Sequence, residues 1–126
     1  MLTIINLTPH TIKLNSGKEF PPSGMVARVS AKYGLRVWIE NFSGIDVFHR
    51  SIPELLKDEI YLYEVNYGEI ENLPEPEEDI FYIVSAMVQE AGKKIRRHDL
   101  LAPATGHPET VRNEQGQIVS VPGFVI

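Results

Sequence analysis

The residues whose types most clearly suit ligand chemistry form a basic cluster in a chain that is acidic as a whole. Lys93, Lys94, Arg96 and Arg97 fall within five positions, although the formal net charge of the 126 residues is -5. Two lysines at the end of a helix interact favourably with the helix dipole, so they need no ligand to explain them. Arginine differs, because its planar guanidinium matches the oxygens of a phosphate in a bidentate contact. The two arginines therefore indicate a candidate anion site.

Another arginine, Arg112, strengthens the prediction of an anion site. We expect Arg96 and Arg97 to open a strand that returns after the helix, and alternation along a strand directs only one of them into a given pocket. We select Arg97, acting with Arg112, which precedes Asn113 at the turn of a predicted closing hairpin. Proline and glycine breaks in the intervening loop would let Thr105 and its neighbours fold back over the arginines.

Aromatic residues complete the candidate site. Phe81 and Tyr82 lie shortly before the predicted helix, and a nucleotide base can stack on such a ring. Arginine, an aromatic ring and a glycine-containing loop are a minimal set for holding a nucleotide. The predicted ligand-binding residues are Arg97, Arg112, Tyr82, Phe81, Arg96, Asn113 and Thr105.

Patterns for catalysis and for metal binding are weak. Ser85 follows a strand and opens a helix, but residues 83–87 lack the glycines of a nucleophile elbow, so we predict that Ser85 is a helix N-cap. The four histidines show no i, i+2 or i, i+4 pairing, and the chain has no cysteine. We therefore predict no catalytic residue, no metal site and no cofactor.

Short β-rich runs predict most of the secondary structure. We expect a helix at 85–92 with Gly92 as its left-handed C′ residue, and residues 53–56 would add one further turn. The predicted strands span residues 2–7, 11–14, 25–30, 35–40, 45–50, 60–65, 80–84 and 99–102, before a hairpin of 110–112 with 117–121. These elements predict a single domain, residues 1–126, of the α+β class. It would be a mainly antiparallel β-sheet with one or two short helices, and helix 85–92 would pack on the sheet or at a subunit interface.

Charge and hydropathy exclude several classes of function. No apolar run approaches the ~20 residues of a membrane span, and the N-terminus lacks the pattern of a signal peptide, so we expect a cytoplasmic protein without a membrane partner. Residues 54–79 hold ten acids and one base, which disfavours binding to long nucleic acid. A local basic pocket can still hold a small anionic ligand.

Three stretches together carry a family resemblance. They are NLTPH at residues 6–10, YIVSA at 82–86, and RHDLLAP at 97–103 with its continuation VRNEQGQIV at 111–119. This combination resembles small proteins encoded by tailed phages and prophages, and it is similar to the phage Thoeris anti-defence sponges. Proteins of that family bind a cyclic ADP-ribose-type signal made by bacterial TIR-domain enzymes and hold it without cleaving it.

The resemblance implies a β-rich protomer in a homo-oligomer built from dimers, with ligand pockets at subunit interfaces lined by aromatic and arginine residues. The expected function is a non-catalytic sponge that inhibits Thoeris defence in the host cytoplasm. Two alternatives remain open. One is a small nucleotide-cleaving enzyme that uses His98 or His107 with a carboxylate. The other is a phage host-interaction or structural module that binds protein through a sheet edge and has no small-molecule ligand.

Overall fold

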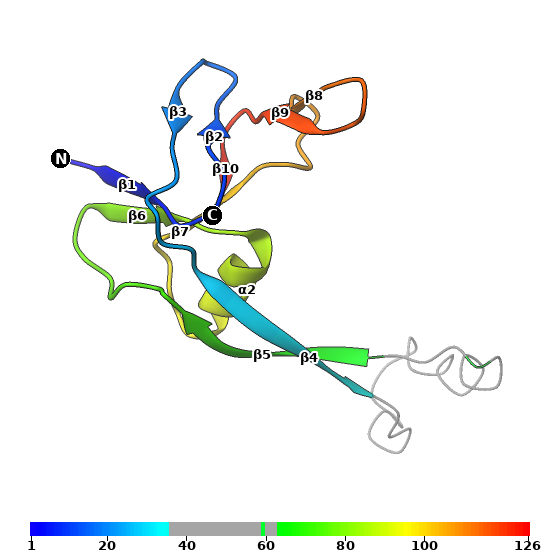
Figure 1. The fold of residues 1–126 in the computed structure, drawn as a ribbon. Coiled ribbons are helices and arrows are strands. Elements are labelled where there is room, and N and C mark those ends of the chain that lie inside the picture. Colours follow the sequence, from blue (N-terminus) through cyan, green and yellow to red (C-terminus); the bar gives the residue numbers. More distant parts are fainter. Residues whose placement is uncertain (36–58, 60–62) are drawn as a thin grey trace. The chain divides into compact units, whose positions relative to one another are not determined.

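The computed structural model describes most of the chain (Figure 1). The described residues are 1–35, 59 and 63–126. They divide into two compact units, residues 1–30 with 69–126 and residues 31–68.

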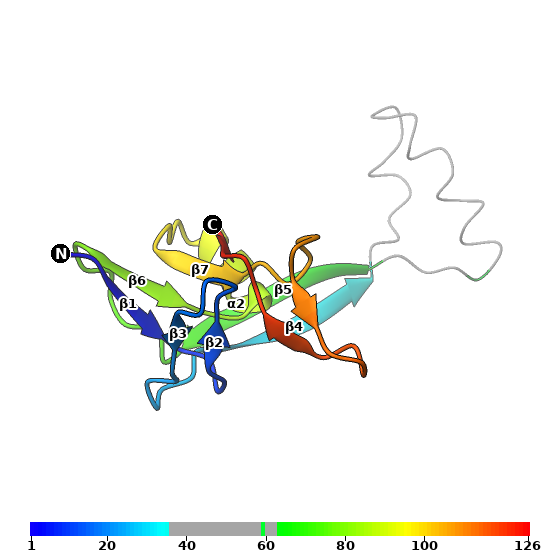
Figure 2. The ribbon, with the colours of Figure 1, turned by 90° about the horizontal axis from the view of Figure 1, so that it is seen from above.

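The first unit is built on a four-stranded sheet with the order β1-β6-β7-β10 (Figures 1 and 2). Its strands are β1 (Thr3–Asn6), β6 (Ile80–Ile83), β7 (Leu100–Pro103) and β10 (Phe124–Val125). β6 pairs in parallel with both β1 and β7, and only β10 runs antiparallel to its neighbour. The prediction of a mainly antiparallel sheet therefore fails at the centre of the fold. For β6 and β7, the reason is that the chain passes through a helix between them, and such a crossover returns the chain in the same direction.

The helix α2 (Ala86–Lys94) makes this crossover. Ser85 is its N-cap, because the Ser85 hydroxyl accepts a hydrogen bond from the Val88 N–H at 3.3 Å, as predicted. α2 contacts β7, and its apolar face buries Val88 and Ala91. Together with Leu7 and Leu100 from the sheet side, Val88 belongs to the hydrophobic core.

The end of α2 differs from the prediction. Gly92 lies inside the helix and is buried against Leu100, so it is not the C′ residue. That position belongs to Arg96, whose φ of 62° is left-handed. The Arg96 N–H donates to the Lys93 carbonyl at 3.1 Å and the Arg97 N–H donates to the Gly92 carbonyl at 2.8 Å, the pattern of a Schellman motif. Both arginines thus belong to the helix end, and the returning strand begins only at Leu100.

Two small antiparallel hairpins complete the first unit. β2 (Ile12–Lys13) pairs with β3 (Glu19–Phe20), and β8 (Val111–Arg112) pairs with β9 (Ile118–Ser120). The β8–β9 hairpin confirms the predicted closing hairpin, and its turn uses Gly116 at a φ of 80°. No helix of the described residues is long and apolar enough to cross a membrane.

β4 (Arg28–Leu35) and β5 (Tyr63–Glu71) form a two-stranded sheet. Residues 31–35 and 63–68 of these strands belong to the second unit, and residues 28–30 and 69–71 belong to the first. β5 continues past residue 65, where the sequence predicted its end. The strand predicted at 45–50 and the helical turn predicted at 53–56 lie outside the described residues, as do parts of the strands predicted at 35–40 and 60–65.

Candidate functional site

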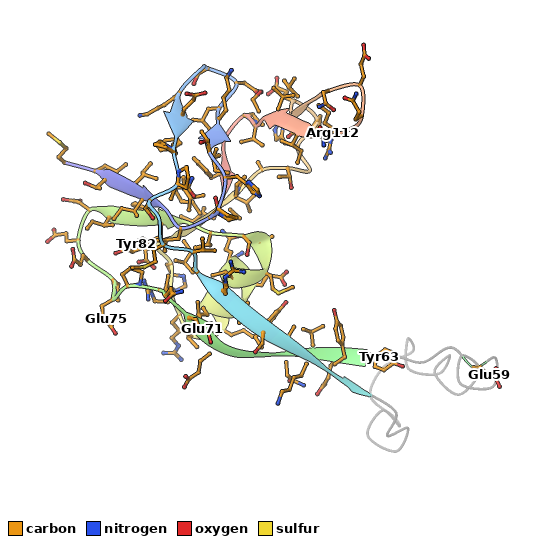
Figure 3. The ribbon with its side chains drawn as sticks, viewed as in Figure 1. Glu59, Tyr63, Glu71, Glu75, Tyr82 and Arg112 are labelled. Carbon is orange, nitrogen blue, oxygen red and sulfur yellow. The ribbon has the colours of Figure 1, made fainter. Side chains whose placement is uncertain are left out.

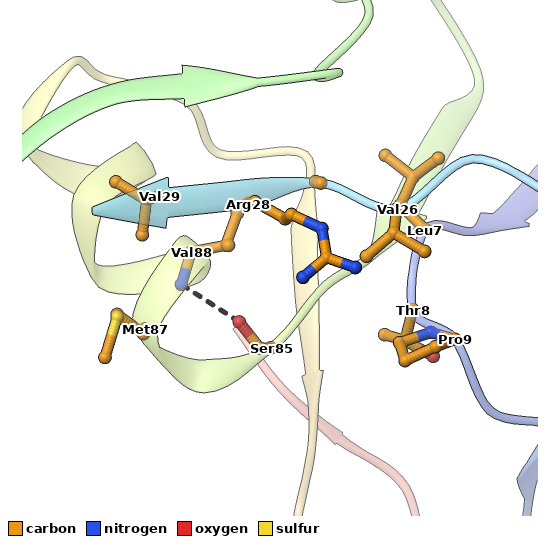
Figure 4. A pocket seen from close by; sticks show the side chains of 10 residues that line it. Leu7, Thr8, Pro9, Val26, Arg28, Val29, Ser85, Met87 and Val88 are labelled. Atoms are coloured by element: carbon orange, nitrogen blue, oxygen red, sulfur yellow. Dashed lines mark hydrogen bonds between the residues drawn. The ribbon is translucent and has the colours of Figure 1, made fainter.

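A pocket of about 360 Å³ lies in the first unit beside the N-terminus of α2 (Figure 4). We call it the α2 pocket. Its described lining comes from three parts of the chain: residues 7–9, residues 26–29, and Ser85 with Met87 and Val88.

The α2 pocket sits where two parallel strands end. Residues 7–9 follow β1, and Ser85 follows β6, which pairs with β1 in parallel. The carboxyl ends of parallel strands share one edge of the sheet, and doubly wound α/β sheets bind their ligands outside the corresponding edge. Topology therefore makes this edge a natural place for a ligand.

The loop after β1 is held in place by Asn6. The Asn6 side-chain oxygen accepts hydrogen bonds from the Thr8 N–H at 2.8 Å and from the Thr8 hydroxyl at 2.7 Å. Its amide donates to the carbonyls of His10 at 2.7 Å and Phe20 at 2.8 Å. Both Asn6 and Thr8 are buried, so this wall of the pocket is preorganised. The Thr8 hydroxyl is already engaged as a donor and is not free for a ligand.

Arg28 supplies the charge of the α2 pocket. It is exposed on β4, and its guanidinium extends across the pocket (Figure 4). Within the described part of the chain it forms no ion pair and no side-chain hydrogen bond. None of the described lining residues is Asp, Glu or His. The five N–H donors of this guanidinium are therefore available to an acceptor-rich ligand.

Ser85 and the first turn of α2 add further donors. The Ser85 hydroxyl accepts from Val88, so its own hydrogen remains available. The first N–H groups of a helix have no acceptor within that helix, and the helix dipole makes this end positive. The first turn of α2 carries no acidic residue that would offset this. The polar groups that line the pocket thus suit an anion, while its walls are mostly aliphatic.

The predicted site residues fall into separate places. Phe81, Arg96 and Arg97 line a different pocket, of about 350 Å³. That pocket also contains three carboxylates, from Glu77, Asp79 and Asp99. Three carboxylates against two guanidinium groups make it a poor place for an anion.

Arg97 is already satisfied by protein groups. It donates to both carboxylate oxygens of Asp99, at 3.0 and 2.9 Å, and to the Pro74 carbonyl at 2.9 Å. The hydrogen bond to Asp99 raises the pKa of Arg97. Burial acts to raise the pKa of Asp99, but hydrogen bonds from Arg97 and from the backbone outweigh it, so that the pKa of Asp99 lies below its usual value.

Tyr82 is part of the hydrophobic core and is 2% exposed, so its ring offers no open face for a base to stack on. Burial raises the pKa of its hydroxyl. Tyr82 on β6 and Arg112 on β8 lie well apart (Figure 3).

The structure does bring Arg112, Asn113 and Thr105 together. Arg112 donates to the Thr105 carbonyl at 3.2 Å and to the Gly116 carbonyl at 2.9 Å. The side-chain oxygen of Asn113 accepts two backbone N–H groups of the hairpin turn, so its role there is to cap the turn. The predicted loop does fold back, but onto Arg112. Arg97 donates to Asp99, just before β7, and Arg112 donates to Thr105, just after β7. Because the strand separates these two contacts, the two arginines do not meet within one copy of the chain.

The comparisons with known proteins leave the family open. No protein-family model, curated protein or solved structure matches this chain. Nor do the described residues contain a group of three or more His, Cys, Asp or Glu that could hold a metal ion.

Sequence reasoning missed Arg28 as a site residue. Only folding relates it to Ser85, because the two residues lie in distant segments of the chain. One signal was present: the NLTPH and YIVSA stretches that carry the family resemblance contribute residues 7–9 and Ser85 to the α2 pocket. Two of the three distinctive stretches thus converge on one cavity.

Proposed function

We propose that this chain is a non-catalytic binding protein that sequesters a small nucleotide-type ligand in the α2 pocket. The observation that carries the proposal is the guanidinium of Arg28, which has no partner among the described residues and lies in a cavity with aliphatic walls. The volume of about 360 Å³ falls in the range of small-molecule sites. An exposed guanidinium without a protein partner, beside apolar walls, suits an anionic ligand.

The chemistry of the lining supports holding rather than cleaving. Among its described residues only Thr8, Arg28 and Ser85 carry polar side chains. General acid-base catalysis needs a group that exchanges a proton near neutral pH, and none of these three does so readily. Ser85 serves as the N-cap of α2, and no described residue bonds to it as a base.

The resemblance to the anti-defence sponges narrows the proposed ligand to a cyclic ADP-ribose-type signal. The protein would act in the host cytoplasm by mass action: each occupied pocket removes one signal molecule, and the TIR-based defence is not triggered. The proposal includes a homo-oligomer built from dimers, as the same resemblance implies.

A thermal-shift screen tests the proposal directly. The purified chain is heated with cyclic ADP-ribose isomers and with cyclic di- and trinucleotides, each in excess. A ligand at one hundred times its Kd adds about 2.7 kcal/mol to the free energy of unfolding, so the melting temperature should rise. A chain that no member of the panel stabilises would contradict the proposal.

The fate of the ligand separates binding from catalysis. After incubation, the complex is heated to release the ligand, which is then analysed by chromatography and mass spectrometry. Recovery of intact ligand is the expected result. Cleavage products that increase with time would show that the chain is a nucleotide-cleaving enzyme and not a sponge.

A further inference from the structure

Three exposed arginines of the first unit are candidates for receiving the ligand, and their surroundings differ. Arg112 already donates to two backbone carbonyls. Arg96 lines a pocket with three carboxylates, which would repel an anion. Arg28 has neither kind of competitor in the described part of the chain. An anion therefore gains most at Arg28, because no contact among the described residues has to be broken there and none of the described lining residues is acidic.

The polar groups around Arg28 select the kind of anion. The free side-chain polar groups of the α2 pocket are donors, the guanidinium of Arg28 and the hydroxyl of Ser85, because Thr8 is engaged with Asn6. A group bound between them must be able to accept several hydrogen bonds. A phosphate does so with three oxygens, and an arginine fork contacts two of them at once.

The remainder of the pocket selects what the phosphate is attached to. Pro9, Val26 and Met87, which are exposed or half-buried, form an apolar wall beside the donors. A free phosphate ion would leave this wall exposed to water, whereas a phosphate ester would cover it with a less polar group. The chemical class that fits is thus a phosphate ester or diphosphate with a flat or apolar body.

The donors and the apolar wall all lie in the first unit of the chain. Resting on the function proposed above, we infer that the α2 pocket binds a phosphate ester whose phosphate lies between Arg28 and Ser85.

Isothermal titration with ADP-ribose, inorganic pyrophosphate and adenosine tests the inference on the intact chain. ADP-ribose should bind, and pyrophosphate should bind more weakly because it leaves the apolar wall uncovered. Adenosine, which lacks phosphate, should bind at least tenfold more weakly than ADP-ribose. Equal affinities for adenosine and ADP-ribose would overturn the assignment of a phosphate site.

Substitutions locate the site. Arg28→Gln should weaken ADP-ribose binding at least tenfold, and Arg28→Lys should restore part of that loss, since it keeps the charge without the fork. Ser85→Asp keeps an N-cap but places a negative charge beside the anion, so it should also weaken binding at least tenfold. Arg112→Gln and Arg96→Gln remove the same charge elsewhere and should change Kd less than threefold. Melting temperatures of all variants check that each is folded.

The outcomes separate this inference from the function it rests on. Normal binding by Arg28→Gln, with loss of binding by Arg112→Gln, would overturn the α2 pocket and leave a nucleotide-binding protein with a different site. Failure of every phosphorylated probe to bind the unmodified chain would overturn both the inference and the proposed function.

Discussion

The guanidinium of Arg97 holds both carboxylate oxygens of Asp99, at 3.0 and 2.9 Å. Their side chains are only 13% and 16% exposed, and the same guanidinium reaches the Pro74 carbonyl. Arg97 thus joins the end of α2 to the segment that leads into β6. A residue type that suggests ligand binding here serves to hold the fold together.

Removal of either partner should destabilise the protein. Arg97→Gln leaves a mostly buried carboxylate and a carbonyl without their donor, and should lower the free energy of unfolding by about 2 kcal/mol. Urea denaturation measures the change. The double variant Arg97→Gln with Asp99→Asn should lose less than the sum of the two single variants, because the pair is then removed as a unit. Strict additivity would show that the two groups do not interact in solution.

The Arg97–Asp99 pair should also make stability depend on pH in the acid range. Because the pKa of Asp99 is lower in the folded protein than in the unfolded chain, where it is about 3.9, this residue contributes stability above that pH. The contribution should disappear as the pH falls through the folded-state pKa. In urea denaturation from pH 6 to pH 2.5, the free energies of unfolding of the unmodified protein and of Asp99→Asn should therefore approach each other at low pH. A stability difference that stays constant across this range would contradict the assignment.

The left-handed backbone of Arg96 predicts a stabilising substitution. A side chain at a φ of 62° strains the backbone, and glycine relieves this at the C′ position of a helix. Arg96→Gly should raise the free energy of unfolding by about 0.5–1 kcal/mol, as measured by urea denaturation. Arg96→Ala removes the same charge without relieving the backbone, so it serves as the control and should not stabilise. Equal increases in the free energy of unfolding of both variants would show that removal of the charge causes the effect.

Substitution of Gly92 should change the free energy of unfolding in the direction opposite to the one that helix propensity alone predicts. In an exposed helix, Gly→Ala stabilises by about 1 kcal/mol. Here the added methyl group would collide with the Leu100 side chain, which is buried in the core. Gly92→Ala should therefore destabilise by about 1–2 kcal/mol in thermal or urea unfolding. Leu100→Val in the same background should recover part of the loss; a stabilised Gly92→Ala protein would show that the core yields easily at this point.

The Asn6 side chain links stability to the proposed binding site. Asn6→Ala removes four hydrogen bonds that fix the loop of residues 7–9, and should cost about 2–3 kcal/mol of folding free energy. The loosened wall should also weaken ligand binding in titration. Asn113→Ala is a matched control, because that side chain caps an exposed turn and does not line the α2 pocket, and its loss should cost about 1 kcal/mol or less.

Several elements followed from local sequence signals. The N-cap role of Ser85, the strand over Ile80–Ile83 and the hairpin turn before Gln117 depend on residues only a few positions apart. Their physical causes, which are capping, a continuous apolar run and turn chemistry, act over that same short range. Local signals also predicted the wrong end for α2, because the burial of Gly92 against Leu100 is a tertiary contact.

The sequence by itself determined the types of residue available: a basic cluster, a chain without cysteine, a capped helix and short strands. Tertiary structure decided their use. Arg97 stabilises the fold because it donates hydrogen bonds to Asp99 and Pro74, and Tyr82 belongs to the core because the folded chain buries its ring. The parallel pairing of β1 with β6 brought Ser85 beside the loop after Asn6, and β4 placed Arg28 at the same pocket. Such pairings depend on which distant surfaces bury each other, and no short stretch of sequence contains that information.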